Sequence, residues 1–171
     1  MMQKKVQIIS DGSLDLSQDL TKEKDIEVVP FYVSFDSETY QKEMVEVGVR
    51  EFYQEMVDHP TVFPKTSMPS VHDYYEVFEK YAKEQLPVIC ICITRKFSGS
   101  LQSATTAKDM ILEEYPDAQI TVIDSTVNTV LQGLYVLEAC RLRDMGLEYQ
   151  EIVDAVSYTH LRAHETDSYL V

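Results

Sequence analysis

The chain has 171 residues, of which 44% are hydrophobic and 26% charged, and its formal net charge is −14. This length and composition fit one globular domain with a substantial core. The negative charge argues against nucleic acid as a partner and against anionic membrane surfaces, because both require a basic face. No apolar run reaches the roughly 18 residues of a membrane-spanning helix, and the N-terminus lacks a signal-peptide pattern. We therefore expect a cytoplasmic protein that is not an integral membrane protein.

The cysteines and glycines argue against disulfides, a zinc site and a phosphate-binding loop. Cys90, Cys92 and Cys140 lie in apolar stretches and are odd in number, which predicts buried, reduced thiols and no disulfide framework. The Cys-x-Cys pair has no nearby Cys or His that could complete a zinc site. With five glycines in the whole chain, there is no glycine-rich phosphate loop. We expect neither a cofactor nor a metal, and nucleotide-dependent chemistry is disfavoured.

Short apolar runs alternate with amphipathic stretches along the chain. They predict strands over residues 6–10, 26–35, 87–94 and 119–123, and helices over residues 14–24, 49–57, 71–81, 98–114, 128–145 and 148–156. The strand at 87–94 is apolar on both alternating faces, which is typical of a central parallel strand, and we expect 119–123 to be central as well. Pro30 interrupts the strand at 26–35 and favours an edge position or a bulge. The order predicts an α/β fold, a layered sandwich around a largely parallel sheet.

The last residues do not continue this pattern. From Ser157 to Val171 the helical spacing set by Ile152 and Val156 is lost, and the segment resembles translated sequencing-adaptor read-through at the end of a truncated gene. We therefore divide the chain into an α/β lobe over residues 1–156 and a foreign tail over residues 157–171. The natural protein is expected to continue past residue 156 with sequence that is missing here.

Four hydroxyl-rich turns follow predicted strands or precede predicted helices. In an open α/β sheet such junctions line the carboxyl edge of the strands, where ligands bind. Neutral hydroxyls beside helix N-termini suit an anionic head group such as a carboxylate or phosphate. The candidate ligand-binding residues are Asp11 and Ser13, Thr66 and Ser67, Ser98, Gly99 and Ser100, and Asp124 and Ser125.

Each of these turns also has a local explanation. Ser98 can simply cap its own helix, Thr66-Ser67 can form a Ser/Thr turn before Pro69, and Asp11 can form an Asx turn. Ser98 could also be the nucleophile of a serine-dependent acyl hydrolase or transferase. That alternative needs a base, for which His72 is a weak candidate, and no Gly-x-Ser-x-Gly elbow is present. The joint placement of the turns favours ligand binding without catalysis.

The chain resembles the N-terminal half of the DegV family of bacterial fatty-acid-binding proteins. The resemblance rests on Asp11-Gly12-Ser13-Leu14-Asp15-Leu16, Lys65-Thr66-Ser67-Met68-Pro69-Ser70, Ser98-Gly99-Ser100-Leu101-Gln102-Ser103-Ala104 and Ile123-Asp124-Ser125. It implies the N-terminal lobe of a two-lobed carrier that buries a long-chain fatty acid between its lobes. The carboxylate would be held by Thr66 and Ser98 and presented to a fatty acid kinase for phosphorylation, so the chain itself would not be an enzyme.

The sequence departs from the family pattern in four ways, one of which is that the segment from Thr126 to Gly133 has one glycine where more are frequent. Gly12 replaces the usual hydroxyl residue after the first aspartate. The run Thr94-Arg95-Lys96-Phe97 stands where paired serines are common. The C-terminal lobe, which covers the acyl chain in the family, is absent. We therefore expect residues 1–156 alone to expose an apolar face and to bind fatty acid poorly.

Overall fold

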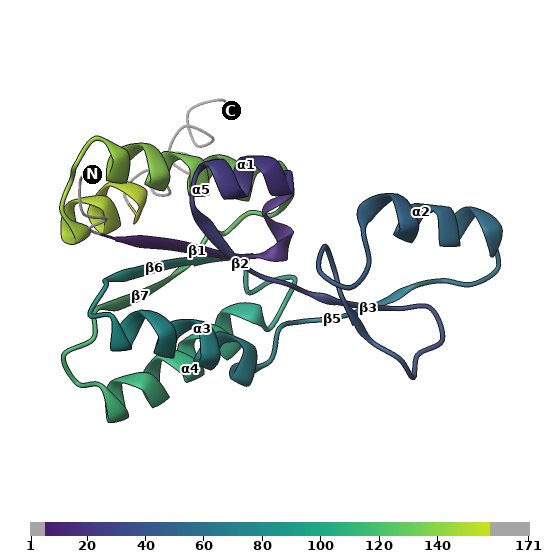
Figure 1. Ribbon diagram of the computed structural model, residues 1–171, viewed down its shortest axis with the longest axis horizontal. Coiled ribbons are helices and arrows are strands. Elements are labelled where there is room, and N and C mark those ends of the chain that lie inside the picture. The colour runs from purple at the N-terminus through teal and green to yellow at the C-terminus, as the bar shows by residue number, and fades with distance from the viewer. Residues whose placement is uncertain (1–5, 158–171) are drawn as a thin grey trace, which may run out of the picture.

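The computed structural model describes residues 6–157. Its body is built on a four-stranded parallel sheet with the strand order β2-β1-β6-β7 (Figure 1). The strands are β1 (Gln7–Asp11), β2 (Ile26–Val29), β6 (Val88–Cys92) and β7 (Ile120–Asp124). The predicted α/β sandwich with a largely parallel sheet is confirmed.

Helices cover both faces of this sheet. On one face lie α3 (Val71–Lys83) and α4 (Ser100–Glu114), as Figure 1 shows. On the other lie α1 (Gln18–Glu23), α5 (Thr129–Asp144) and a helical segment over residues 149–157. None of the helices within residues 6–157 is long and apolar enough to cross a membrane.

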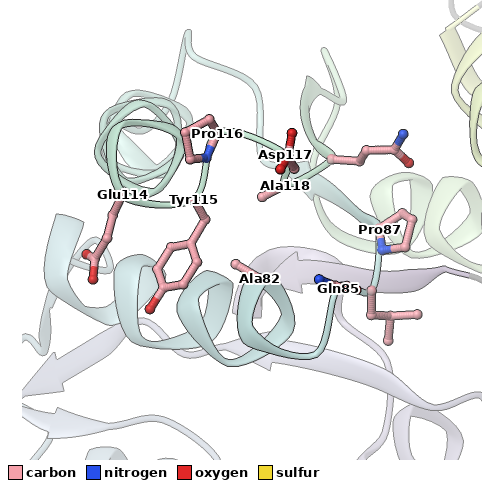
Figure 2. Close-up of a pocket in the computed structure, with 10 residues that line it drawn as sticks. Ala82, Gln85, Pro87, Glu114, Tyr115, Pro116, Asp117 and Ala118 are labelled. Carbon is pink, nitrogen blue, oxygen red and sulfur yellow. The ribbon is translucent and has the colours of Figure 1, made fainter.

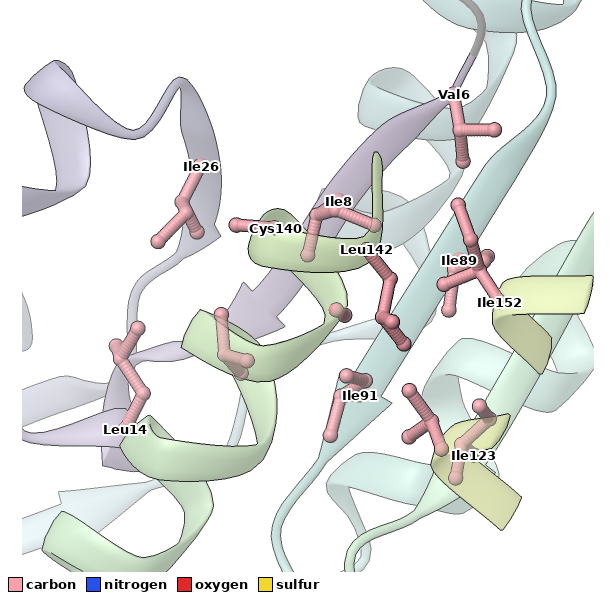
Figure 3. Close-up of a cluster of buried hydrophobic side chains, with 13 residues drawn as sticks. Val6, Ile8, Leu14, Ile26, Ile89, Ile91, Ile123, Cys140, Leu142 and Ile152 are labelled. Carbon is pink, nitrogen blue, oxygen red and sulfur yellow. The ribbon is translucent and has the colours of Figure 1, made fainter. Parts of the chain in front are cut away.

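The core is divided by the sheet, and β6 supplies both halves. Ile89 and Ile91 point into a cluster beneath α5 (Figure 3). Val88, Cys90 and Cys92 point the other way, into the cluster under α3 and α4. All five side chains are 0% exposed. A fully buried aliphatic side chain contributes roughly 1.5–3 kcal/mol, so the alternating apolar pattern of 88–92 fixes this strand at the centre of the sheet.

Local signals set where the long helices begin and end. Ser70 accepts a hydrogen bond from the Asp73 amide while the Asp73 carboxylate accepts one from the Ser70 amide, which is a capping box at the start of α3. Gly146 follows α5 with a φ of +89°, the left-handed conformation that ends a helix. The predicted stop at Gly146 is confirmed.

The segment 26–35 forms two strands instead of the single predicted strand. Pro30 and Phe31 break it, and β3 (Tyr32–Ser34) leaves the body to join a second, antiparallel sheet with the order β4-β3-β5. The other strands of that sheet are β4 (Gln41–Lys42) and β5 (Lys65–Ser67). Because β2 is already an edge strand and proline cannot donate to a ladder, the chain can leave the first sheet at this point.

Two further expectations were wrong in detail. β7 pairs with β6 alone within the described residues, so it is an edge strand and not a central one. The predicted helix over 14–24 is a short 3-10 turn (η1, Gly12–Leu14) followed by α1, whose first turn is capped by the Ser17 hydroxyl. Polar Ser17 interrupts the helix because its side chain bonds the Leu20 amide 3.3 Å away.

Residues 30–69 form what we call the arm, which projects from the body (Figure 1). It comprises the antiparallel sheet and α2 (Val49–Asp58), a helix that the sequence predicted. α2 contains no buried residue, and all three residues of β5 are exposed. The arm therefore has little core of its own.

Candidate ligand site

The carboxyl edge of the parallel sheet is organised around the fully buried carboxylate of Asp11, the last residue of β1. Its Oδ2 accepts hydrogen bonds from the Ile93 amide at 2.9 Å and the Ser100 hydroxyl at 2.7 Å. Its Oδ1 accepts from Gln132 Nε2 at 2.8 Å and lies 2.5 Å from the Ser13 hydroxyl. Charge-assisted hydrogen bonds of this kind can hold a buried carboxylate without a cation.

The same network orients Ser98. The Tyr74 hydroxyl lies 2.6 Å from Ser100 Oγ, and Ser100 in turn donates to Asp11. Burial raises the pKa of Tyr74 well above its ordinary value, so Tyr74 stays protonated and is the donor to Ser100. The Ser100 amide donates to Ser98 Oγ at 3.1 Å. Since Ser98 accepts this bond, its own O–H remains available to donate to a ligand oxygen.

Gln132 was missed by the sequence reasoning, although it bonds to the ends of two strands, β1 and β6. It is fully buried on α5 and also donates to Ser10 Oγ at 3.0 Å. A single glutamine inside an amphipathic helix carries no motif, and its importance comes from the packing of α5 over η1. Gly133 permits this packing, because a Cβ there would lie 2.5 Å from the Leu14 carbonyl oxygen.

The turn at Asp124 and Ser125 lies at the same edge, but the side chains of these two residues form hydrogen bonds within the turn. The Ser125 hydroxyl donates to the Val127 carbonyl at 2.9 Å, and Asp124 Oδ1 accepts from the Thr126 amide at 2.8 Å. The Ser125 amide donates to the Cys92 carbonyl, which ties the turn to β6. Their side chains thus support the edge, and a ligand contact by either residue stays a prediction.

Thr66 and Ser67 are not in a turn. They lie on β5, where Thr66 pairs with Val33 of β3 and both side chains are exposed. Within the described residues the Thr66 hydroxyl has no hydrogen-bond partner. Thr66 lines a cavity of about 680 Å³ between the body and the arm, whose apolar lining includes Leu16, Val33 and Phe52.

Gly99 brings the end of the arm onto the body. A Cβ at Gly99 would lie 2.6 Å from Met68 Sδ, so glycine makes room for Met68 to pack on the start of α4, and a larger residue would push the Met68 side chain aside. Met68 follows β5 directly, and Gly99 follows Ser98. This close approach draws the Thr66 strand toward the Ser98 turn, two segments that are far apart in the sequence.

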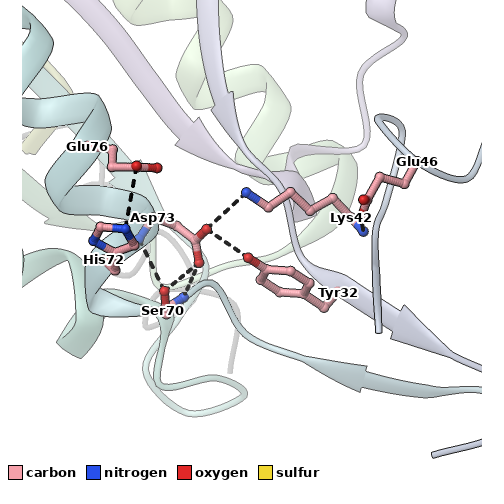
Figure 4. Close-up of polar contacts among 7 residues, drawn as sticks. All are labelled: Tyr32, Lys42, Glu46, Ser70, His72, Asp73 and Glu76. Carbon is pink, nitrogen blue, oxygen red and sulfur yellow. Dashed lines mark hydrogen bonds and ion pairs between the residues drawn. The ribbon is translucent and has the colours of Figure 1, made fainter. Parts of the chain in front are cut away.

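A polar cluster fixes the other side of the arm (Figure 4). Asp73 on α3 accepts a hydrogen bond from the Tyr32 hydroxyl at 2.7 Å and pairs with Lys42 Nζ at 3.2 Å. Burial works to raise the pKa of Asp73, but the hydrogen bonds from Ser70, Tyr32 and Lys42 outweigh it and hold that pKa at about 2. The carboxylate is therefore ionised at neutral pH and links α3 to β3 and β4.

No described side chain is placed as a base for Ser98. His72 lies on the exposed face of α3 with Nε2 3.4 Å from Glu76, and His59 pairs with Glu55 at 3.0 Å on α2. Within residues 6–157 there is also no group of His, Cys, Asp or Glu side chains that could hold a metal ion. The arrangement can position and hydrogen-bond an anionic head group.

Comparison with known proteins agrees with this geometry. The family described as "Uncharacterised protein, DegV family" matches residues 5–169. The chain belongs to the DegV family. A DegV domain-containing protein of Clostridium acetobutylicum is 35% identical over 155 residues, which cover 91% of this chain and 53% of the relative.

Two solved DegV-like structures share the fold. The stearic-acid-binding protein of Eubacterium ventriosum has a TM-score of 0.85 and 44% identity, covering 89% of this chain and 52% of its own. A DegV family protein of Thermus thermophilus, described by its fatty acid binding, has a TM-score of 0.77 and 28% identity, covering 91% and 53% of the two chains. The chain thus spans about half the length of these relatives. The family match includes part of segment 157–171, whose foreign origin stays a prediction; residues 158–171 lie outside the described residues.

The DegV lobe has another cavity, of about 570 Å³, at the opposite end of the sheet (Figure 2). It lies between the loops that precede β6 and β7 and is lined by residues such as Ala82, Pro87 and Tyr115. None of the nine predicted ligand residues lines it. The cavity that contains Thr66 is therefore the better candidate for a ligand.

Proposed function

We propose that this chain is the N-terminal lobe of a fatty-acid carrier, in which the hydroxyls of Thr66 and Ser98 hold the ligand's carboxylate. The natural protein would continue beyond residue 156 with a second lobe. The observation that carries this proposal is the 44% identity and shared fold with a protein that binds stearic acid.

The geometry of the site supports the same conclusion. Ser98 and Thr66 both keep a hydroxyl proton available, and the packing of Met68 on Gly99 draws their segments together. The cavity beside Thr66 is lined in part by hydrocarbon. Each buried methylene of an acyl chain contributes about 0.8 kcal/mol, so the chain supplies most of the affinity and the hydroxyls fix its orientation.

Exposed apolar side chains indicate where the second lobe would dock. Phe97, beside the Ser98 turn, is 71% exposed. Val130, Leu131 and Leu134, on the first turns of α5, are 55 to 56% exposed. These residues lie at the carboxyl end of the sheet, where ligands of open α/β folds bind. An apolar face at this edge fits burial by a second lobe closing over the acyl chain.

The proposed role includes presenting the bound acid to a fatty acid kinase in the cytoplasm. The kinase would supply the ATP site and the catalytic groups, while the carrier shields the acyl chain from water. The absence of a base beside Ser98 in the described residues supports this division of labour over hydrolysis by the chain itself.

Native mass spectrometry of the completed protein tests the carrier function. The downstream half would be recovered from the gene, or supplied by the C-terminal lobe of the Eubacterium ventriosum relative. We expect a co-purified mass equal to one fatty acid that disappears on denaturation. A protein that stays empty after incubation with C12 to C18 acids would contradict the proposal.

Matched substitutions at the two hydroxyls separate a carrier from an esterase. Ser98→Ala and Thr66→Ala should each weaken fatty acid binding about ten- to a hundredfold, the loss of one hydrogen bond to a charged group. Thr61→Ala, in the exposed turn before β5, removes a hydroxyl that is not among the candidates; it serves as the control and should bind normally. Turnover of a p-nitrophenyl ester that Ser98→Ala abolishes would show that Ser98 is a nucleophile.

A further inference from the structure

Glu43 occupies a position that the sequence gave no reason to single out. It follows β4 in the arm, and its Oε1 accepts a hydrogen bond from the Phe31 amide at 3.1 Å. The carboxyl lies directly against Gly12 of the body, and a Cβ on residue 12 would overlap Oε1. The departure from the family pattern at Gly12 therefore has a structural counterpart, since a missing side chain on the body makes room for a carboxyl from the arm.

Glu43 and Thr66 line the same cavity. The other acidic side chains along it are Asp15 and Asp19, and no Lys, Arg or His is among its lining residues. The nearest basic neighbour in sequence, Lys42, is engaged by Asp73 at 3.2 Å. An ionised ligand entering this cavity thus meets carboxylates without a compensating cation from the described residues.

The charges around Glu43 oppose its ionisation. Burial is the main reason that its pKa is raised, the Phe31 amide works in the opposite direction, and the nearby charge of Asp11 raises the pKa further. The charged groups on the elements around it are Asp11 on β1, Asp15 after η1 and Asp19 on α1, with Lys42 and Glu46 in its own turn. Two carboxyl groups that approach each other in such surroundings share one proton, because both cannot stay ionised.

We propose that Glu43 is a specificity-determining residue of the ligand cavity, which shares a proton with the ligand's carboxyl so that each fatty acid enters together with one proton. This inference rests on the fatty-acid-carrier function proposed above. Glu43 then selects for carboxylic acids over head groups that cannot be protonated, such as alkyl sulfates, which have the same chain but a permanent charge.

Calorimetric titration of the completed protein with dodecanoate, kept below its micellar concentration, tests this assignment. Measurement in two buffers of different ionisation enthalpy counts the protons taken up. For the wild type we expect uptake approaching one proton per ligand and an affinity that falls about tenfold per pH unit between pH 7 and 8.5. Glu43→Gln keeps the acceptor for the Phe31 amide, and it should take up no proton and bind with a flat pH profile.

Three variants control the result. Asp19→Asn removes the same charge from the same cavity without touching Gly12, and it should keep the wild-type slope. Thr66→Ala should weaken binding at every pH and leave the proton count unchanged. Gly12→Ala should displace the Glu43 carboxyl and flatten the profile as Glu43→Gln does. In parallel, Glu43→Gln should narrow the preference for dodecanoate over dodecyl sulfate at least tenfold.

Failure of this inference can be told apart from failure of the carrier function. If dodecanoate binds the wild type and Glu43→Gln with equal proton uptake and equal slopes, Glu43 has no role in the site while the carrier function stands. If neither protein binds any fatty acid between pH 5.5 and 8.5, the carrier function falls and the role of Glu43 falls with it.

Discussion

The body and the arm are stabilised in different ways. In the body, β1 and β6 are buried along their whole length, and helices press on both faces of the sheet. In the arm, α2 has no buried residue and β5 is fully exposed. The arm keeps its place through a few specific contacts, namely Asp73 with Tyr32 and Lys42, Met68 on Gly99, and Glu43 on Gly12. A dense core thus holds the body, whereas the arm depends on these few contacts.

The largest expected effect is in the body. Phe78 on α3 is 0% exposed and packs against Tyr74 with ring centroids 5.8 Å apart. Phe78→Ala should lower the free energy of unfolding by about 3–5 kcal/mol, because it removes buried hydrocarbon and leaves a cavity. Urea denaturation followed by circular dichroism measures this. A loss of unfolding free energy below about 1 kcal/mol would contradict a densely packed core in the body.

The buried carboxylate at the edge of the body should come next. Asp11→Asn keeps the shape of the side chain but turns an NH₂ group toward donors such as Ser100 and the Ile93 amide. We expect a loss of about 2–3 kcal/mol, because buried polar groups are left without partners. The control is Asp124→Asn at the end of β7, where the carboxylate is partly exposed and the loss should stay below about 1 kcal/mol. Equal losses in the two variants would contradict the central role of Asp11.

A smaller effect is expected where the arm is attached. The pKa of Asp73 in the folded protein is about 2, below its ordinary value of 3.8, so the folded state is favoured above pH 4 and this advantage is lost as the pH falls toward 2. Asp73→Asn should therefore cost about 1–2 kcal/mol at pH 7, and the gap to the wild type should close in acid. Unfolding experiments from pH 7 down to pH 2 measure the gap.

Hydrogen exchange locates the same effect. In Asp73→Asn the amide of Val33 in the arm should exchange faster, while that of Ile89 in the body should be unchanged. The control is Lys83→Gln, which breaks an exposed pair with Glu79 and should change stability by less than about 0.5 kcal/mol. Uniform acceleration across the body and the arm would contradict a local attachment.

The smallest effect is expected on the outer helix of the arm. Val57 on α2 is 72% exposed. Val57→Ala should change the unfolding free energy of residues 1–156 by no more than about 0.5 kcal/mol in either direction, because almost no surface is buried there. A loss above about 1 kcal/mol in urea denaturation would show that α2 is packed against something.

The sequence predicted the body better than the arm. The doubly apolar strand at 88–92 and the stop at Gly146 could be recognised because each signal is local. The departure of the chain at Pro30, the edge position of β7 and the strand that carries Thr66 depend on pairings between distant segments. Short exposed strands such as β5 carry no hydrophobic alternation, so the turn expected at Thr66 was a reasonable but wrong interpretation.

The site residues also divide into those that local sequence signals predicted and those that only the structure revealed. Hydroxyl turns after strands marked Asp11, Ser13, Ser98 and Ser100, and the structure brings three of these together through hydrogen bonds, with Ser98 attached through the Ser100 amide. Gln132 and Glu43 could not be found in this way, because their contacts join segments that meet only in the folded chain. Gly12 was noted only as a departure, and its meaning required the position of Glu43.

The buried cysteines have a practical consequence. Cys90, Cys92 and Cys140 are free and buried, and burial raises the pKa of Cys140 to about 11. Thiol reagents attack exposed thiolates, so we expect the three native cysteines to remain unlabelled. A single cysteine introduced at Val57 would carry a fluorophore or spin label on the arm without removal of any native residue. Spectroscopy of this label would then report whether the arm moves when a ligand binds.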